Sequence, residues 1–394
     1  MRVDQLASLG YLSHVPQERA AELRGVVKSA RRRTLAGITG FGRRKGDPEG
    51  YFFDREGREL WRFSARPGAG DSLLWMEPTS DGNLLISGRG YLIKTDWSGR
   101  PHWQADERDY HHGFTQSPDG TIFAMTSRER TVALGGHELT ITDDEIAVLS
   151  ADGRILREIS IFDLLGPAAI PQPMVQLLVE SESADPTAVR ERASELRIDY
   201  RRDVLHLNSV AVLPRDIGVA AAGDLLVCLR SLDLVLAVSL EPLAVVWRWE
   251  EGRELLERPH APTPLANGNI LIFDNGWGRG YSRLVELDPR RGEIVWQYVA
   301  DPPESFYTRR GGIAQVLPDG HLLVTQSDAG RVFEITRAGE IVWDFWNPIF
   351  DADESSGPPK RRTIYRAWRW FEGDLRGSID LPEPLRTGWL ARRG

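Results

Sequence analysis

Short apolar runs alternate with polar, glycine-containing turns along most of the chain, and this pattern recurs. Five segments consist of a turn and an alternating or continuously apolar strand: PTSDGNLLISGRG (78–90), QSPDGTIFAMTSR (116–128), VAAAGDLLVCLRS (219–231), PLANGNILIFDNG (264–276) and VLPDGHLLVTQSD (316–328). A second hairpin follows each one, as in LVELDPRRGEIVWQY and VFEITRAGEIVWDF. Each unit is therefore predicted to contain four strands.

The spacing of these units is typical of propeller blades. The turn glycines lie 38, 103, 45 and 52 residues apart, at Gly82, Gly120, Gly223, Gly268 and Gly320. One blade takes ~40–50 residues, so the longest interval contains an insertion. We place this insertion at 161–202, where Asp185 can cap a helix that begins at Pro186.

Five units close a ring only if a sixth exists. The segment GYFFDREGRELWRFS (50–64) has the pattern of an outer hairpin without an inner one, and TIYRAWRWF (363–371) can complete that blade. Closure of this kind removes exposed sheet edges. We predict one all-β domain, a six-bladed β-propeller over 46–371 closed by the C-terminal strand. A small helical insertion (161–202), an irregular or partly helical N-terminal lead-in (1–45) and a C-terminal tail (372–394) accompany it.

Composition agrees with many turns and flat side chains packed between strands. The 394 residues include 38 glycines, 24 prolines and 13 tryptophans. The tryptophans that recur near strand ends, Trp103, Trp247, Trp296 and Trp343, are expected to pack between blades. The single cysteine, Cys228, is expected to be a buried thiol without a disulfide partner in the chain.

Charge and hydropathy narrow the classes of partner. The formal net charge of −8 argues against a nucleic-acid surface. The sequence has no run of 18 apolar residues and no evident signal peptide, so we expect no membrane association and a cytoplasmic location. The oligomeric state is not predicted.

Histidines occupy equivalent positions in the repeat. His112 and His260 each lie eight residues before the turn glycine of their unit. Alignment of a third unit places Asn208 in the same position, with His206 two residues earlier and therefore on the same strand face. Because the first strand of a blade is innermost, these side chains are expected to converge at one mouth of the channel. His321 follows its turn directly and is expected to be structural, as are His14, His102 and His137.

A polar collar is predicted next to these histidines, because the second strand of each antiparallel hairpin ends beside the start of the first. Its members are Arg89, Ser127–Arg128, Arg230–Ser231, Asp274–Asn275 and Ser327–Asp328. An arginine at the end of a buried strand, such as Arg230, is well placed to hold an anion.

These residues suit two chemistries. A neutral imidazole can attack an electrophilic centre while arginine, amide and protonated histidine groups stabilise negative oxygens. Alternatively, three imidazoles can bind zinc, copper or iron. The neighbouring arginine favours group transfer, since a fixed cation repels a second cation. A third possibility is a non-catalytic propeller that binds a ligand or a protein. No nucleotide-binding loop occurs, so no cofactor is predicted.

Several motifs together resemble the PAPS-independent arylsulfotransferases. They are DVLHLNSVAVLP (203–214), LLVCLRSLDLVLAVS, RPHAPTPLANGNILIFDNG (258–276), the pair His111-His112 and GRVFEITRAGEIVWDFWNP. The resemblance covers roughly residues 50 to 350. It implies a six-bladed propeller that moves a sulfuryl group from an aryl sulfate donor to a phenolic or other hydroxyl acceptor through a sulfated histidine.

The resemblance also implies roles for individual residues. His260 would be the nucleophile, and Arg230, His112 and His206 with Asn208 would bind the sulfuryl oxygens and assist proton transfer. We add four residues to the substrate-binding set from their positions near the histidines: His111, Asn275, Arg128 and Arg89. No metal ligand is assigned.

Overall fold

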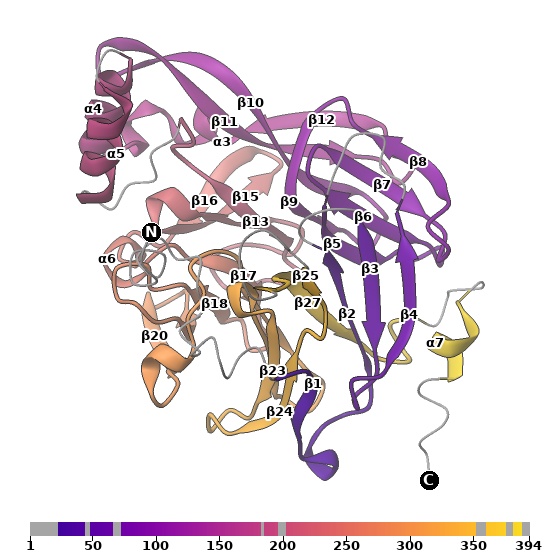
Figure 1. Ribbon diagram of the computed structural model, residues 1–394. Helices are drawn as coiled ribbons and strands as arrows, with labels where there is room; N and C mark the ends of the chain where they lie inside the picture. Colours follow the sequence, from indigo (N-terminus) through magenta and orange to yellow (C-terminus); the bar gives the residue numbers. More distant parts are fainter. Residues whose placement is uncertain are drawn as a thin grey trace.

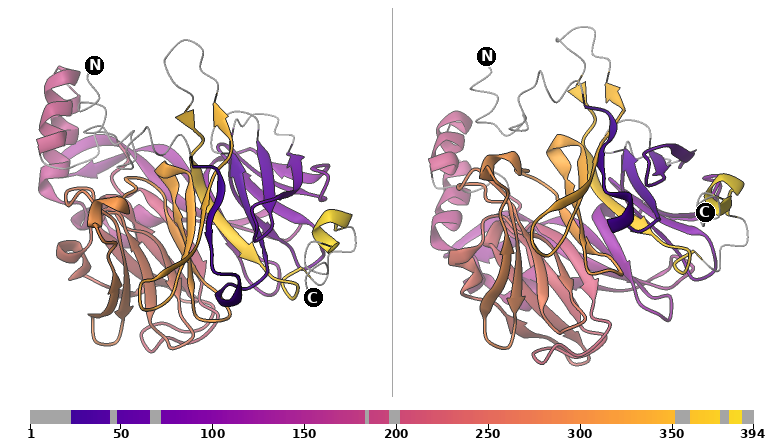
Figure 2. Two further views of the ribbon diagram at one scale, coloured as in Figure 1. Left: turned by 60° about the horizontal axis from the view of Figure 1, so that its bottom comes forward. Right: turned by 90° about the horizontal axis from the view of Figure 1, so that it is seen from below.

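The computed structural model describes residues 23–43, 48–65, 72–182, 185–195, 202–351, 360–375 and 381–387. These residues form six antiparallel sheets of four or five strands that stand as blades around a ring (Figure 1 and Figure 2). Contacts between neighbouring blades run around the whole circle, and the C-terminal strand contacts both the first and the last blade. The all-β class and the six-bladed propeller are therefore confirmed.

Blades 2 to 5 each consist of four consecutive strands. Blade 2 contains β5 (Leu73–Pro78), β6 (Leu84–Gly88), β7 (Tyr91–Thr95) and β8 (Pro101–Ala105); blade 3 contains β9 (Asp109–Gln116), β10 (Ile122–Leu134), β11 (His137–Leu149) and β12 (Ile155–Ser160). Blade 4 contains β13 (Leu207–Val212), β14 (Leu225–Leu229), β15 (Leu234–Leu240) and β16 (Leu243–Arg248); blade 5 contains β17 (His260–Pro264), β18 (Ile270–Asp274), β19 (Arg283–Asp288) and β20 (Glu293–Tyr298). The continuously apolar β14 is buried on both faces, as its sequence predicts.

The five turn glycines that defined the repeat share one conformation. Their φ angles are 85° at Gly82, 87° at Gly120, 91° at Gly223, 85° at Gly268 and 83° at Gly320. Only glycine adopts this left-handed region without strain, so the recurrence of glycine follows from the turn itself.

The C-terminal strand closes the ring as predicted. Blade 1 has the order β27 (Ile364–Trp370), β2 (Ile38–Arg43), β3 (Glu49–Phe53) and β4 (Glu59–Ser64). Blade 6 contains β21 (Ile313–Val316), β22 (Leu322–Gln326), β23 (Arg331–Ile335), β24 (Ile341–Trp346) and, as a fifth strand, β1 (Gly25–Ser29). The segment before β27 contains the two-stranded pair β25 (Phe350–Asp351) and β26 (Lys360–Arg361).

A buried polar network fastens the closing strand. On β27, Arg369 forms an ion pair with Glu334 of β23, and both side chains are fully buried. The Arg369 backbone exchanges two hydrogen bonds of 2.8 Å with the Gln315 side chain. Its guanidinium also donates to Thr39 Oγ1 at 3.2 Å and lies 4.6 Å from the ring centre of Trp343. One side chain therefore joins blades 1 and 6.

Part of the expected N-terminal lead-in differs from its predicted irregular or partly helical form. Two of its segments are strands, β1 and β2, on either side of the short 3₁₀ helix η1 (Arg31–Arg33). The strand β2 (ITGFGR) was not predicted because it contains two glycines, and glycine is depleted in strands. A Cβ atom at Gly40 would lie 2.5 Å from Trp370, and one at Gly42 would lie 2.1 Å from Leu73, so large neighbours fill that space. Residues 1–22 and 44–45 lie outside the described residues.

The helical insertion is present between β12 and β13. It contains α3 (Ile161–Leu165), η2 (Pro167–Ala169), α4 (Gln172–Ser181) and α5 (Pro186–Glu195). Asp185 caps α5 by accepting a hydrogen bond from the Ala188 N–H at 3.1 Å, as predicted. The insertion packs on the long ends of β10 and β11, where Leu134 and Leu139 join one apolar cluster with Val175 (Figure 1).

The remaining short elements are η3 (Arg230–Leu232), α6 (Gly252–Leu255), η4 (Pro303–Ser305), η5 (Ser327–Ala329) and α7 (Glu383–Thr387). In the C-terminal tail, Leu375, Leu381 and Leu385 are buried against blade 1. Among the described residues, no helix is long and apolar enough to span a bilayer. The cytoplasmic location stays a prediction.

Tryptophan indoles join neighbouring blades in a repeated way. In five of the six blades an indole N–H near the outer edge donates to a carbonyl of the next blade: Trp61 to Trp97, Trp103 to Ala151, Trp249 to Gly292, Trp296 to Arg337 and Trp343 to Arg55. The packing role predicted for Trp103, Trp296 and Trp343 is thus seen directly. In blade 4 the residue that bonds is Trp249, whereas Trp247 packs partly buried beside it.

Candidate functional site at the channel mouth

The inner strands of blades 3, 4 and 5 begin with irregular backbone at one mouth of the ring. The strand register shifts near His112 in β9, at Leu207–Ser209 in β13 and after His260 in β17. Five residues in or beside these strand starts have positive φ angles without being glycine: His112 (57°), His206 (52°), Asp233 (52°), Arg258 (58°) and Ala261 (46°). Bulges re-aim side chains, and non-glycine residues in the left-handed region cluster at functional sites. The strained backbone marks this mouth as the candidate site.

In blade 3, two consecutive histidines face each other. Consecutive residues of a regular strand point to opposite faces, but the left-handed conformation of His112 brings both rings to the same side. Nδ1 of His111 lies 2.6 Å from Nδ1 of His112. Nε2 of His111 lies 3.3 Å from Oδ1 of Asp144, which is buried on β11. Asp144, His111 and His112 therefore form a continuous row.

In blade 4, His206 has its own carboxylate. Nδ1 of His206 lies 2.5 Å from Oδ2 of Asp203, and the other oxygen of Asp203 accepts the His206 backbone N–H at 3.0 Å. The carboxylate therefore holds the ring from two points. The His206 ring packs edge-on against His112, with 5.0 Å between ring centres, and Tyr365 of β27 lies 5.9 Å from His112 on another side.

In blade 5, His260 is almost fully buried and has an amide partner. Asn275 donates its amide hydrogens to the carbonyls of Thr308 and Gly311, at 2.9 Å each, so its Oδ1 faces His260 as an acceptor. Nδ1 of His260 lies 2.7 Å from that oxygen and must carry the proton. The lone pair is therefore on Nε2, where the Gly311 N–H donates to it at 3.1 Å.

Two buried arginines and Asn208 complete the mouth. Arg230, 2% exposed, follows β14, and its backbone N–H donates to the carbonyl of His206 at 3.0 Å. Arg366, 6% exposed, comes from the closing strand and donates to the Asn208 carbonyl at 2.7 Å. The Asn208 side chain donates to the Pro259 carbonyl at 2.8 Å, directly before His260. Asn208 thus fastens blade 4 to the start of β17.

The charges of the mouth set different protonation states for its histidines. Burial lowers the pKa of His260 well below 6.5, and the positive charge of Arg230 lowers it further. Burial also lowers the pKa of His112, helped by His111, His206 and Arg366. Both rings are therefore neutral near pH 7. The pKa of His111 is raised instead, because the contact with Asp144 outweighs the effect of burial.

The two carboxylates are also perturbed in opposite directions. Burial raises the pKa of Asp144, and the negative charge of Asp203 raises it further. The pKa of Asp203 is lowered, since the charge and hydrogen bond of His206 outweigh its burial. Asp203 is therefore held as a carboxylate beside His206.

The structure brings together seven of the nine residues predicted from the sequence. They are His111, His112, His206, Asn208, Arg230, His260 and Asn275. Arg128 is exposed on β10 and pairs with Glu145 at 2.9 Å, because β10 continues straight through this position. Arg89 is exposed in the turn between β6 and β7. Neither guanidinium is part of the buried cluster.

Four side chains of the mouth were not predicted from the sequence: Asp144, Asp203, Tyr365 and Arg366. Signals for three of them were present. Acidic residues inside the apolar strand ITDDEIAVL and an arginine inside IYRAW are unusual for buried strands, and Asp203 lies only three residues before His206. The Gly311 N–H has no side-chain signal, because any residue except proline supplies a backbone donor.

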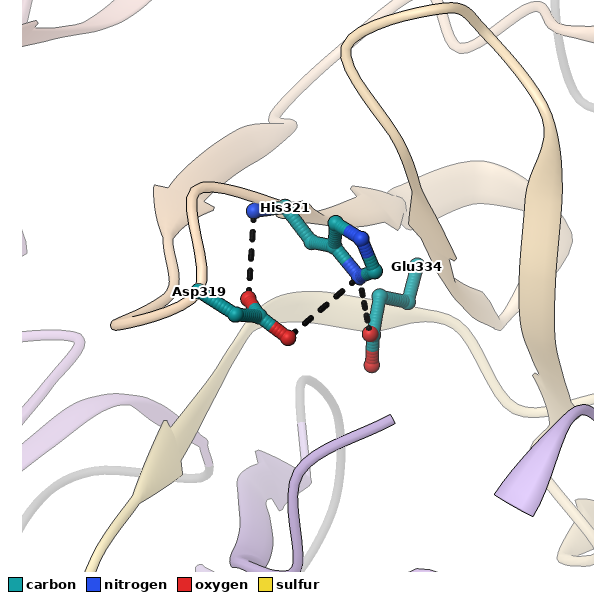
Figure 3. Close-up of side chains that lie close together, drawn as sticks. All are labelled: Asp319, His321 and Glu334. Atoms are coloured by element: carbon teal, nitrogen blue, oxygen red, sulfur yellow. Dashed lines mark hydrogen bonds and ion pairs between the residues drawn. The ribbon is translucent and has the colours of Figure 1, made fainter. Parts of the chain in front are cut away.

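A separate histidine lies at the opposite end of the β22 strand, as expected for His321. Figure 3 shows it between two carboxylates: Nδ1 of His321 is 2.9 Å from Glu334 and 3.5 Å from Asp319. Their ligand atoms lie within 4.8 Å of one another, and the channel histidines form no such group in the described part of the chain. Arg369 already pairs with Glu334 and supplies positive charge there, so we assign this group to the closure of the ring.

Fold and mouth together define a six-bladed propeller whose channel ends in a cluster of histidines and arginines. The sequence model of the arylsulfotransferase (ASST) family matches residues 79–348, which include all nine predicted site residues. The match covers more than half of the chain, and the chain belongs to this family. The resemblance inferred from the motifs is confirmed.

Comparison with solved structures finds other proteins at low identity. A protein of unknown function from Bacteroides caccae is 14% identical, with a TM-score of 0.49, covering 84% of this chain and 98% of the other. A streptogramin B lyase is 13% identical, with a TM-score of 0.45, covering 82% of each chain. These likenesses carry no functional argument. No curated protein matches the chain.

Proposed function

We propose that the protein transfers a sulfuryl group from an aryl sulfate to a phenolic or other hydroxyl acceptor, through a sulfohistidine at His260. Family membership supports the arylsulfotransferase class. The observation that carries the assignment of the nucleophile is the partner of His260. Its Nδ1–H faces a neutral amide oxygen of Asn275, whereas His111 and His206 face carboxylates.

A neutral hydrogen-bond partner suits a histidine that first attacks sulfur and later acts as the leaving group. When Nε2 attacks sulfur, the ring becomes a sulfurylated imidazolium whose Nδ1–H stays bonded to Asn275. A carboxylate in that position would draw off the Nδ1 proton and make the ring a poorer leaving group. The low pKa of His260 keeps the ring neutral, and therefore nucleophilic, near pH 7.

The first half-reaction forms an N–S bond and breaks the bond between sulfur and the aryl oxygen. The electron pair leaves with the phenoxide oxygen, which takes a proton from a neighbouring histidine. Arg230 and Arg366 stabilise the negative sulfuryl oxygens, as charged groups do in phosphoryl transfer. The Gly311 N–H must release Nε2 for attack, and it is then free to donate to a sulfuryl oxygen.

The second half-reaction reverses these events with a new hydroxyl group. The acceptor oxygen attacks sulfur, the N–S bond breaks, and its electron pair returns to Nε2 of His260. The hydroxyl proton passes to a histidine base, for which His206 is the best placed because the Asp203 carboxylate, 2.5 Å from its Nδ1, orients the ring. This proton then passes through solvent from His206 to the histidine that protonated the phenoxide, which regenerates the enzyme without any cofactor.

The test is to find the sulfurylated residue. The full chain is mixed with 4-nitrophenyl sulfate without acceptor, and we expect a burst of nitrophenol and a mass increase of about 80 Da, located on His260 by peptide mapping. His260→Asn should abolish both signals. His102→Asn, which removes an exposed histidine on β8 bonded to Asn83, is the matched control and should keep both. A wild-type protein that releases nitrophenol with no adduct, or that forms one on another residue, would overturn the assignment.

A further inference from the structure

The contact between His111 and His112 requires a proton between the two rings. Two imidazole nitrogens at 2.6 Å cannot both present lone pairs, so one Nδ1 donates and the other accepts. The pair therefore has a direction, and the groups around each ring decide which nitrogen holds the proton.

The surroundings place the proton on His111. The far nitrogen of His111 faces the carboxylate of Asp144 at 3.3 Å, and Asp203 adds a second negative charge nearby. His112 is surrounded instead by His111, His206, His260 and Arg366, with Tyr365 against its ring. A positive charge is stabilised on His111 and destabilised on His112. His111 is therefore the donor, and His112 accepts at Nδ1.

This assignment leaves His112 with its own proton on Nε2. A neutral imidazole carries one N–H, and Nδ1 is already an acceptor. The Nε2–H is the only hydrogen that the ring can give to another molecule. The low pKa that makes His112 a weak base would, however, make it a poor reservoir of acid by itself.

We propose that Asp144, His111 and His112 form a proton relay in which His111 stores the proton and His112 delivers it to the departing phenoxide. This inference rests on the proposed function, because the phenoxide is the leaving group of sulfuryl transfer. His112 gives its Nε2 proton to the phenoxide oxygen and at the same time receives the Nδ1 proton of His111. His112 stays neutral throughout, and His111 ends as a neutral ring that keeps its Nε2–H toward Asp144.

The relay separates acid from base at the mouth. The Asp203 carboxylate contacts the His206 ring directly, whereas the carboxylate of blade 3, Asp144, contacts His111 and acts on His112 one histidine away. Blade 3 is thus built to supply a proton and blade 4 to receive one. His111 and Asp144 are positioning and relay residues that act through His112.

The test compares two donors that differ in their need for acid. 4-Nitrophenyl sulfate releases an acidic phenol that departs as the anion, while phenyl sulfate releases a phenol of pKa about 10, as for tyrosine. In His111→Asn and Asp144→Asn we expect the first half-reaction with phenyl sulfate to slow by about 100-fold, the scale of general acid catalysis, and that with 4-nitrophenyl sulfate by less than about threefold. Asp203→Asn is the control for the second half-reaction. It should slow acceptor-dependent turnover by the same factor with both donors.

A second measurement does not depend on turnover. Nitrogen NMR of histidine-labelled protein should show His111 protonated on both nitrogens and His112 protonated on Nε2, with a low-field proton signal that is lost in His111→Asn. If the wild type transfers from neither donor, the proposed function fails. If the wild type uses both donors but Asp144→Asn slows them equally, or the NMR places the shared proton on His112, the relay is wrong while sulfuryl transfer stands.

Discussion

Two buried polar clusters of the ring, the channel mouth and the closure, contain similar residues but have different roles. At the closure, buried Arg369 is matched by buried Glu334, and Thr39 and Gln315 bond the same arginine residue. At the mouth, Arg230 and Arg366 lie near imidazoles, and their charge lowers the pKa of His260 and His112.

The difference lies in what each arginine contacts. A matched ion pair inside the fold locks two elements together, and removing one partner leaves a buried charge uncompensated. Cations that lower the pKa of neighbouring histidines can also stabilise a negative group that binds from outside. The same contrast appears in the backbone: non-glycine residues with positive φ include His112 and His206 at the mouth, and none belongs to the closure residues named above.

The largest effect is expected from breaking the closure. Glu334→Gln leaves the buried Arg369 guanidinium without its carboxylate and should lower the free energy of unfolding by about 3–5 kcal/mol, measured by urea denaturation. The folded fraction should keep its transfer activity, because Glu334 lies outside the mouth. Asp319→Asn, which alters an exposed neighbour of the same group, should change stability by less than about 0.5 kcal/mol. Equal losses in the two variants would contradict the distinction.

The reverse result is expected at the mouth. Arg230→Gln removes a cation that the proposed reaction uses, and the rate of sulfuryl transfer should fall by about 100-fold or more. The free energy of unfolding should fall by less than in Glu334→Gln, because the two carboxylates near Arg230, Asp203 and Asp233, also have His206 and Arg258 as partners. Arg157→Gln on the exposed outer strand β12 is the control and should leave both properties unchanged. A variant of Arg230 that unfolds but transfers normally when folded would assign it to structure.

The smallest effect concerns pH. His112 and His260 have a lower pKa in the folded chain than the value of about 6.5 in an unfolded chain. Below that pH the unfolded chain binds more protons, so stability falls as pH falls, by up to about 1.4 kcal/mol per pH unit for each histidine. His260→Asn should show a shallower decline between about pH 6.5 and 5. Identical slopes in urea titrations of both proteins would show that His260 titrates normally.

Much of the fold was predictable because the repeat depends on residues that are close together in the sequence. A glycine with positive φ at each turn and the alternating strands after it specify hairpins, and equal spacing specifies blades. The strand β2 could not be found this way. Its glycines are explained only by Trp370 and Leu73, which come from elsewhere in the chain.

The site was predictable to the extent that equivalent positions of a repeat converge. His112, His206 and His260 followed from that symmetry, and the structure places them at one mouth. The exposed positions of Arg89 and Arg128 did not follow, because the turn after β6 and the long β10 depart from the repeat locally. The repeat also did not predict that Trp249, rather than Trp247, makes the indole hydrogen bond of blade 4.

The sequence by itself determined the number of blades, the closing strand, the insertion and the histidines that meet, since these depend on periodicity and turn chemistry. Only the tertiary structure decided what each histidine contacts. Asp144 comes from β11, Asp203 from the return of the insertion and Asn275 from the end of β18. The protonation of an imidazole depends on these neighbours within a few ångströms, and no local pattern along the chain specifies them.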